Sequence, residues 1–121
     1  MKIAIPVDEH SRDTKVCISF GRTPYFLIYD IDNNEEVFIE NTAASSQGGA
    51  GIKAAQLVVD NAVDALITPR CGENAANVFI AANIKLYKTI NDCVNDNIEA
   101  FKCGKLTALD NIHPGFHGHG G

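Results

Sequence analysis

The most informative stretch of this 121-residue sequence is Ala65-Leu-Ile-Thr-Pro-Arg-Cys-Gly-Glu73. Its first four residues are apolar or β-branched and are followed by Pro69, which is typical of a short strand buried inside a parallel sheet. A helix is expected to follow over residues 73–83, with one apolar face: Ala75, Ala76, Phe79 and Ala82. The stretch therefore predicts a buried strand that leads through a tight loop into a helix.

The residues before this stretch predict a strand, a hairpin and a helix. Lys2–Val7 alternates apolar residues at period two, and Pro6 indicates an edge or the end of a strand. Two aromatic and β-branched runs, Tyr25–Ile31 and Val37–Glu40, are joined by Asp32-Asn-Asn-Glu35, where Asn tolerates the left-handed backbone of a tight turn. A glycine-rich turn then leads into an amphipathic helix whose apolar face is expected to hold Ile52, Ala55, Val59, Ala62 and Val63.

The residues after the stretch predict one more strand and one more helix. Ile84–Tyr87 is a short strand, and Val94, Ile98 and Phe101 mark a helix that Asn91 or Asp92 caps and Gly104 ends. Alternation of strands with helices implies right-handed crossovers and a mostly parallel sheet that is covered on both faces. We therefore expect a three-layer α/β/α domain in which the hairpin supplies one antiparallel strand.

Composition limits the function. The chain has 10 Lys and Arg against 15 Asp and Glu, a formal net charge of −5, which argues against nucleic acid as a partner. No apolar run approaches the roughly 20 residues that span a bilayer, and the first residues do not resemble a signal peptide, so we expect a cytoplasmic protein without a membrane partner. A domain of this size needs no disulfides, so its four cysteines are available as ligands, nucleophiles or core residues.

Ligands of open α/β sheets bind beyond the carboxyl ends of the strands, where the strand order reverses. This rule directs attention to three loops, residues 8–21, 44–51 and 69–72. Cys71 is the first candidate ligand or nucleophile, because a helix N-terminus lowers the pKa of a thiol and Arg70 adds positive charge. Gly72 would offer backbone N–H groups to an anion. The alternative at Cys71 is a small buried residue that only packs.

The other two loops hold further candidates. Gly48 and Gly49 permit an anion-binding nest of N–H groups, although glycines before a helix are equally ordinary turn residues, and the loop has no Gly-Lys-Ser/Thr of an ATP site. Cys17 lies in the first loop and is expected to approach Cys71, while Arg22 would neutralise an anionic ligand. Two thiolates there would favour copper, zinc or iron-sulfur species, although no recognised metal-binding spacing is present.

The last residues differ from the rest of the chain. We divide the sequence into an α/β domain at residues 1–110 and a flexible Gly/His-rich tail at residues 111–121. His113, His117 and His119 are candidate metal ligands, because a flexible segment lets imidazoles meet the geometry of a transition metal. A polar tail without a function is the alternative.

Two enzyme hypotheses can be compared with these residues. A thiol-dependent enzyme acting on a small molecule would use Cys71 with His10 or a tail histidine as base. A two-metal nuclease is rejected, because Asp8 ends its strand whereas Asp64 precedes its strand and would lie at the opposite edge. A cofactor-free interaction or regulatory module, in which the cysteines merely pack, stays open beside the thiol enzyme.

Five segments resemble the dinitrogenase iron-molybdenum cofactor biosynthesis family, whose small nitrogenase accessory and carrier domains include the molybdenum-copper orange proteins. They are Met1-Lys-Ile-Ala-Ile-Pro-Val7, Phe20-Gly-Arg-Thr-Pro-Tyr-Phe26, Gly48-Gly-Ala-Gly51, Pro69-Arg-Cys-Gly-Glu-Asn-Ala75 and Ala100-Phe-Lys-Cys-Gly-Lys-Leu106. The Phe-Gly-Arg segment followed by an aromatic strand is the most specific of them.

The resemblance implies a ribonuclease-H-like α/β/α fold with a mixed five-stranded sheet. It also implies a non-catalytic role in binding or carrying an anionic metal-sulfur cluster of the iron-molybdenum or molybdenum-copper type. The cluster would be exchanged with donor or acceptor proteins, and the cluster chemistry would belong to the cofactor. The residues expected to hold it are the loop residues and tail histidines named above.

Overall fold

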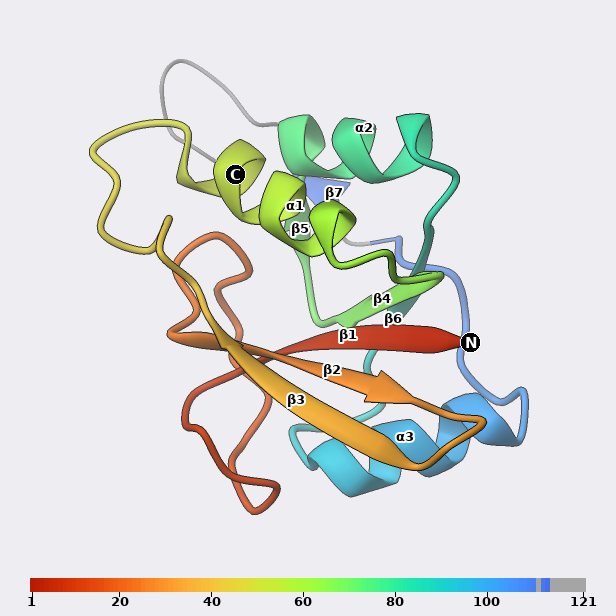
Figure 1. Cartoon of the computed structure of the whole chain (residues 1–121). Coiled ribbons are helices and arrows are strands. Elements are labelled where there is room, and N and C mark those ends of the chain that lie inside the picture. The colour runs from red at the N-terminus through yellow and green to blue at the C-terminus, as the bar shows by residue number, and fades with distance from the viewer. Residues whose placement is uncertain (111, 114–121) are drawn as a thin grey trace.

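The computed structural model describes residues 1–110 and 112–113 (Figure 1). Its strands are β1 (Lys2–Val7), β2 (Tyr25–Asp30), β3 (Glu35–Glu40), β4 (Ala65–Thr68), β5 (Cys71–Gly72), β6 (Lys85–Lys88) and β7 (Ile112–His113). Its helices are α1 (Ala50–Asp60), α2 (Glu73–Ala81) and α3 (Val94–Lys102). No helix in the described part of the chain is long and apolar enough to cross a membrane.

Five strands form the main sheet in the order β3-β2-β1-β4-β6. The pairs β1–β4 and β4–β6 are parallel, whereas β2 is antiparallel to both of its neighbours, β1 and β3. Four strands therefore run in one direction, and β2 alone runs against them. This arrangement confirms the expected mixed five-stranded α/β fold with one antiparallel strand, and it puts the reversal of strand order between β1 and β4.

Each face of the sheet is covered by helices. One core, on the α1 and α2 face, includes Phe20, Phe26, Leu66 and Phe79. The other, on the α3 face, includes Ile3, Ile5, Ile67 and Ile98. Figure 1 shows α1 and α2 together above the sheet and α3 below it. Because β4 is central, its successive side chains enter both cores, which explains why Ala65–Thr68 has no polar face.

The hairpin between β2 and β3 forms as its sequence predicts. The two strands pair over their full length from Tyr25↔Glu40 to Asp30↔Glu35. Asn34 has φ of 55°, a left-handed conformation that Asn tolerates better than most residues. The carboxylate of Asp30 accepts hydrogen bonds from the backbone N–H groups of Asp32 and Asn33, which closes the turn.

Three details differ from the sequence-based expectations. In α1 the buried residues are Ala50, Gly51, Ala54, Ala55 and Val58, whereas Ile52 is 44% exposed. The expected apolar face was therefore wrong in part: Ala55 is buried as expected, but Ala54 and Val58 are buried with it, while Val59 is half-buried and Ala62 lies exposed beyond the end of the helix. The N-cap of α3 is Cys93 rather than Asn91 or Asp92, and α2 ends at Ala81.

Candidate functional site

The carboxyl edge of the main sheet brings the three predicted loops together. Because β1, β3 and β4 run in the same direction, the loops that follow Val7, Glu40 and Thr68 all begin at this edge. The helices α1 and α2, which follow two of these loops, also begin there. The topology thus favours a ligand at this carboxyl edge, between β1 and β4, where the strand order reverses.

The Phe20-Gly21 pair anchors the first loop in the core. The ring of Phe20 is 2% exposed and lies 5.3 Å from the ring of Phe26 and 5.5 Å from that of Phe79, measured between centroids. Gly21 lies against the start of α1, where a Cβ atom would come 3.1 Å from the Cα and N atoms of Gly51. The loop and the helix can approach this closely because neither residue has a side chain at the contact.

Arg22 and Asn41 join the first loop to the second. The Arg22 Nη1 donates to the carbonyl of Ala44 at 2.8 Å and to that of Ser46 at 3.0 Å. The buried Asn41 donates its amide N–H groups to the carbonyls of Gly21 and Thr23 at 3.1 and 2.9 Å. Arg22 is therefore partly occupied in organising the loop. Sequence reasoning missed Asn41, because a single Asn after a strand is not a distinctive signal.

The glycine loop leads into α1 without a side-chain cap. Gly49 is the N-cap with φ of 68°, and no side chain hydrogen-bonds to the first turn, which also lacks acidic residues. Lys53 donates from Nζ to the Ser46 hydroxyl at 2.8 Å, so Lys53 and Arg22 both contact Ser46. Periodicity alone puts Lys53 on a polar helix face and gives it no role. The position of Lys53 at the start of the helix could have indicated this contact, because helical side chains tilt toward the N-terminus and so toward the preceding loop.

Cys71 lies inside the core rather than at an open surface. It is 1% exposed, belongs to the cluster on the α1 and α2 face, and its thiol donates to the carbonyl of Gly72 at 3.5 Å. Burial raises the pKa of the Cys71 thiol to about 12. The expectation that the helix start lowers this pKa was wrong, because loss of solvation outweighs the helix dipole here.

The start of α2 is also free of a side-chain cap. Gly72 is its N-cap, and no side chain hydrogen-bonds to the first turn, although Glu73 supplies one negative charge there. Arg70 is exposed, and its backbone carbonyl accepts a hydrogen bond from the Thr68 hydroxyl at 3.0 Å. Within the described residues, the Arg70 guanidinium has no carboxylate partner within 4.0 Å, so its charge is available to a ligand.

Cys17 and His10 each have contacts of their own. Cys17 is half-buried, with its thiol 3.6 Å from the carbonyl of Ser19, and burial raises its pKa. His10 stacks on Phe38 and Tyr25, at 4.6 and 5.6 Å between ring centroids, on the opposite face of the sheet from Cys71. Among the side chains that the structure describes, no three of His, Cys, Asp and Glu form a group that could hold a metal ion.

The start of the tail lies beside the Cys71 loop. The short strand β7 pairs in parallel with β5, with Ile112 opposite Cys71 and His113 opposite Gly72. The backbone of His113 thus reaches the candidate site. Sequence patterns could not predict this position, because a strand of two residues has no periodicity to detect. His117 and His119 lie outside the described residues.

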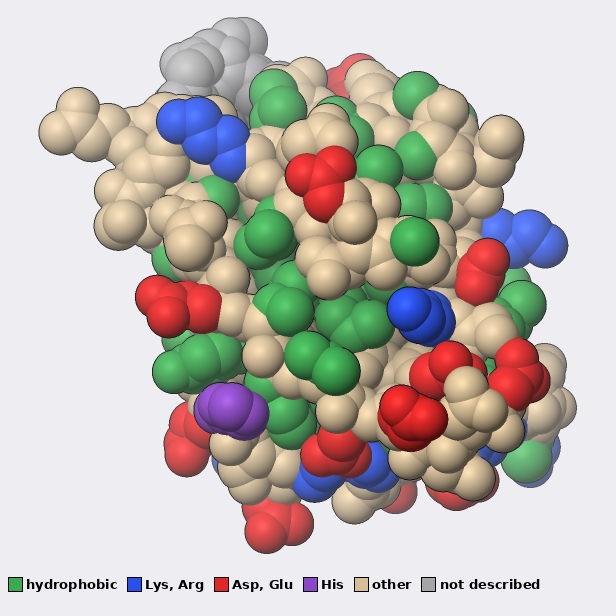
Figure 2. Space-filling model, viewed as in Figure 1, with side chains coloured by type: hydrophobic (Ala, Val, Ile, Leu, Met, Phe, Trp, Pro, Cys, Tyr) green, Lys and Arg blue, Asp and Glu red, His purple; other side chains and the backbone are tan. Residues whose placement is uncertain are grey.

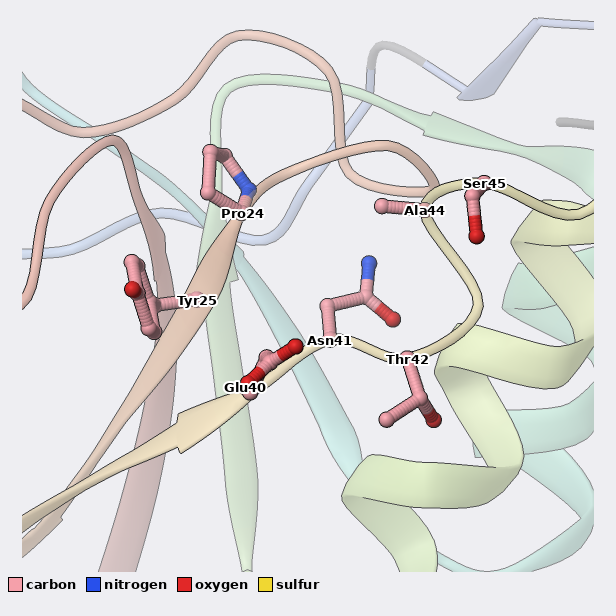
Figure 3. A pocket seen from close by; sticks show the side chains of 7 residues that line it. All are labelled: Pro24, Tyr25, Glu40, Asn41, Thr42, Ala44 and Ser45. Atoms are coloured by element: carbon pink, nitrogen blue, oxygen red, sulfur yellow. The ribbon is translucent and has the colours of Figure 1, made fainter.

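An open pocket of about 560 Å³ lies at the ends of β2 and β3 on the same edge. Figure 3 shows Tyr25 and Glu40 on the strands, with Asn41, Thr42, Ala44 and Ser45 on the segment that follows β3. The Glu40 carboxylate would repel an anion, so this pocket is less suited to an anionic ligand than the surface that carries Arg22, Lys53 and Arg70.

Comparisons with known proteins agree on one family. The family model for dinitrogenase iron-molybdenum cofactor matches residues 1–104. The uncharacterized protein MJ0580 of Methanocaldococcus jannaschii is 35% identical over 113 residues, covering 91% of this chain and 92% of that protein. Among solved structures, the apo orange protein of Desulfovibrio gigas superposes with a TM-score of 0.85 at 25% identity, covering 91% of this chain and 93% of its own. A Thermotoga protein of the DUF35 family superposes with a TM-score of 0.78 at 34% identity, covering 89% of this chain and 92% of its own.

Proposed function

Because the chain belongs to the dinitrogenase iron-molybdenum cofactor family, we propose that it binds and carries an anionic metal-sulfur cluster without catalysing a reaction. The cluster, of the iron-molybdenum or molybdenum-copper type, is the cargo and is exchanged with donor and acceptor proteins. The structure of the relative from Desulfovibrio gigas is that of an apo form, which supports a role in which the cofactor binds reversibly.

One observation carries the proposal: positive charge gathers at the carboxyl edge of a chain whose net charge is −5. Arg22 and Lys53 both contact Ser46 and have no carboxylate within 4.0 Å in the described part of the chain. In this proposal the backbone N–H groups at Gly48 and Gly49 before α1 and at Gly72 before α2 also face the cluster, since no side chain caps either helix start. Cations and free N–H groups are the donor set that an anionic cluster requires.

Direct coordination by Cys71 requires a conformational change. The thiol is buried and has a pKa of about 12, so it reaches a cluster as a thiolate only when the β5–β7 pair opens and a metal displaces the proton. Opening would also release His113 from its pairing with Gly72. In this proposal Arg22, Arg70 and Lys53 attract the cluster first, and Cys71, Cys17 or the tail histidines ligate it afterwards.

The test is reconstitution of the full chain under anaerobic conditions, followed by desalting and measurement of iron, molybdenum, copper and sulfide per protein. We expect retained metal and sulfide in the native chain and a clear loss in the double variant Lys53→Ala/Arg70→Ala. The matched control is Lys85→Ala, an exposed cation at the amino edge of β6.

A second set of variants separates the ligands. Cys71→Ser and a chain that ends before His113 test the body and the tail, and Cys103→Ser, an exposed cysteine after α3, controls for non-specific thiol loading. Native chain that retains neither metal nor sulfide would refute the proposal and favour a cofactor-free module. Equal loading of the double variant and Lys85→Ala would refute the site. The thiol-enzyme alternative is disfavoured because the Cys71 thiol is buried, and one of its candidate bases, His10, lies on the other face of the sheet.

A further inference from the structure

The strand β3 forms one edge of the main sheet. In the described part of the chain β3 pairs with β2 only and has no strand on its other side. Alternate residues of an edge strand direct their backbone N–H and C=O groups away from the sheet. Six residues, Glu35–Glu40, can therefore accept one further strand.

The side chains along β3 have an apolar centre and acidic ends. Val37 is 58% exposed, and Phe38 and Ile39 are half-buried. Glu35 and Glu40 are exposed at the two ends, and neither has a basic partner within 4.0 Å among the described residues. Figure 2 shows hydrophobic side chains over the middle of this face of the molecule, with acidic side chains on either side of them.

A hollow lies at each end of the strand. The pocket of about 560 Å³ includes Glu40 and Tyr25. A smaller one of about 160 Å³ is lined by Lys2, Ile28, Asp30, Glu35 and Val37. Long side chains of an added strand thus have both space and a carboxylate available at each end of β3.

We propose that the outer edge of β3 binds an extended, basic segment of a partner protein by strand addition. Residues directly opposite each other on neighbouring strands point to the same face, so the segment would carry Lys or Arg opposite both Glu35 and Glu40, with β-branched residues between them. The alternative occupant is a second copy of this chain. Antiparallel self-pairing would bring Glu35 of one copy against Glu40 of the other, and such like-charge pairs are destabilising.

The test is a titration of the full ¹⁵N-labelled chain, without metal, monitored by NMR. The probe is the peptide acetyl-Lys-Val-Thr-Val-Thr-Lys-amide, and its control replaces both lysines with glutamate. We expect saturable chemical-shift changes and slowed amide exchange along β3 with the basic peptide, and about tenfold weaker binding of the acidic one. The double variant Glu35→Lys/Glu40→Lys should reverse this preference.

A second pair of variants tests the apolar centre. Val37→Lys should abolish the shift changes, whereas Ile80→Lys, at a position on α2 that is 60% exposed, should leave them unchanged. Equal affinity for the two peptides, shift changes away from β3 or no binding would overturn the proposal. Dimerisation through β3 in the absence of peptide, detected by sedimentation, would overturn it in favour of a second copy. Metal is absent from the assay, so its outcome is independent of cluster binding.

Discussion

Gly21→Ala tests the close approach that holds the first loop against α1. A Cβ atom at this position would lie 3.1 Å from both the Cα and the N atom of Gly51 and 3.5 Å from the carbonyl carbon of Ala50. These neighbours are backbone atoms, so they cannot move aside as the end of a flexible side chain would. Loop and helix must separate by a few tenths of an ångström, which strains the Arg22 and Asn41 hydrogen bonds.

The size of the effect follows from two opposing terms. Overpacking of a well-packed contact costs about 1–3 kcal/mol. Alanine also reduces the conformational entropy of the unfolded chain, which stabilises the folded state by about 0.4–1 kcal/mol. This gain applies here because the φ of Gly21 is not in the left-handed region, so alanine can adopt it. The free energy of unfolding should therefore fall by about 0–2.6 kcal/mol, with a midpoint of about 1.3 kcal/mol that corresponds to a fall in Tm of roughly 5 °C.

Urea and thermal unfolding of the native chain, Gly21→Ala and Gly48→Ala measure this difference. Gly48 is the matched control, because it lies in the neighbouring loop, has no positive φ, and a Cβ atom added there would meet nothing within 4 Å. We expect Gly48→Ala to be neutral or more stable by up to about 1 kcal/mol. Gly21→Ala that is as stable as Gly48→Ala would refute the reasoning.

Three further predictions concern other parts of the fold. Cys71 keeps its proton in the folded state up to a pKa of about 12, so its contribution to stability is present below pH 9 and falls by about 1.4 kcal/mol per pH unit above it. Urea unfolding at pH 7 to 10 should show this slope in the difference between the unfolding free energies of the native chain and Cys71→Ala, because the contribution of the half-buried Cys17 is common to both. Asn97→Ala should lower the free energy of unfolding by about 2–4 kcal/mol in urea titrations, because the Ile90 N–H and the Asn91 carbonyl lose their bonds to the buried amide and the Cys93 carbonyl keeps only its bond from the Asn97 backbone. Arg22→Ala should accelerate amide exchange at Ala44 and Ser46 and cost about 1–2 kcal/mol, and unchanged exchange there would contradict the role of Arg22.

The order of elements was predictable because it depends on local periodicity. The strand at Lys2–Val7 alternates at period two, and the hairpin strands are aromatic and β-branched runs on either side of a turn. The wholly apolar to β-branched run Ala65–Thr68 indicated burial on both faces. The turn at Asn34 was equally local, since it requires only a residue that tolerates positive φ. The family resemblance implied the number of strands, and the observed sheet confirms it.

The rotation of α1 was less predictable because it depends on a partner. Periodicity favours a stripe that contains Ile52 and Ala55 and leaves Ala54 outside it, but small residues are needed where α1 meets α2 and Gly21. Ala54 and Val58 are consequently buried, whereas Ile52 is 44% exposed. Periodicity identifies an amphipathic helix, but the sizes of the facing residues decide which side is buried.

By itself the sequence determined that the loops after the strands ending at Val7, Glu40 and Thr68 share one edge, because strand and helix alternation restricts the topology to right-handed crossovers. Only the tertiary structure decided the state of Cys71. It belongs to the core cluster that includes Phe20 and Phe79, and its strand partner is Ile112. These residues come from distant parts of the chain, and their packing removes the thiol from water. Solvation depends on all atoms that surround a group, so the same Pro-Arg-Cys-Gly stretch fits an exposed thiolate or a buried thiol until the fold is known.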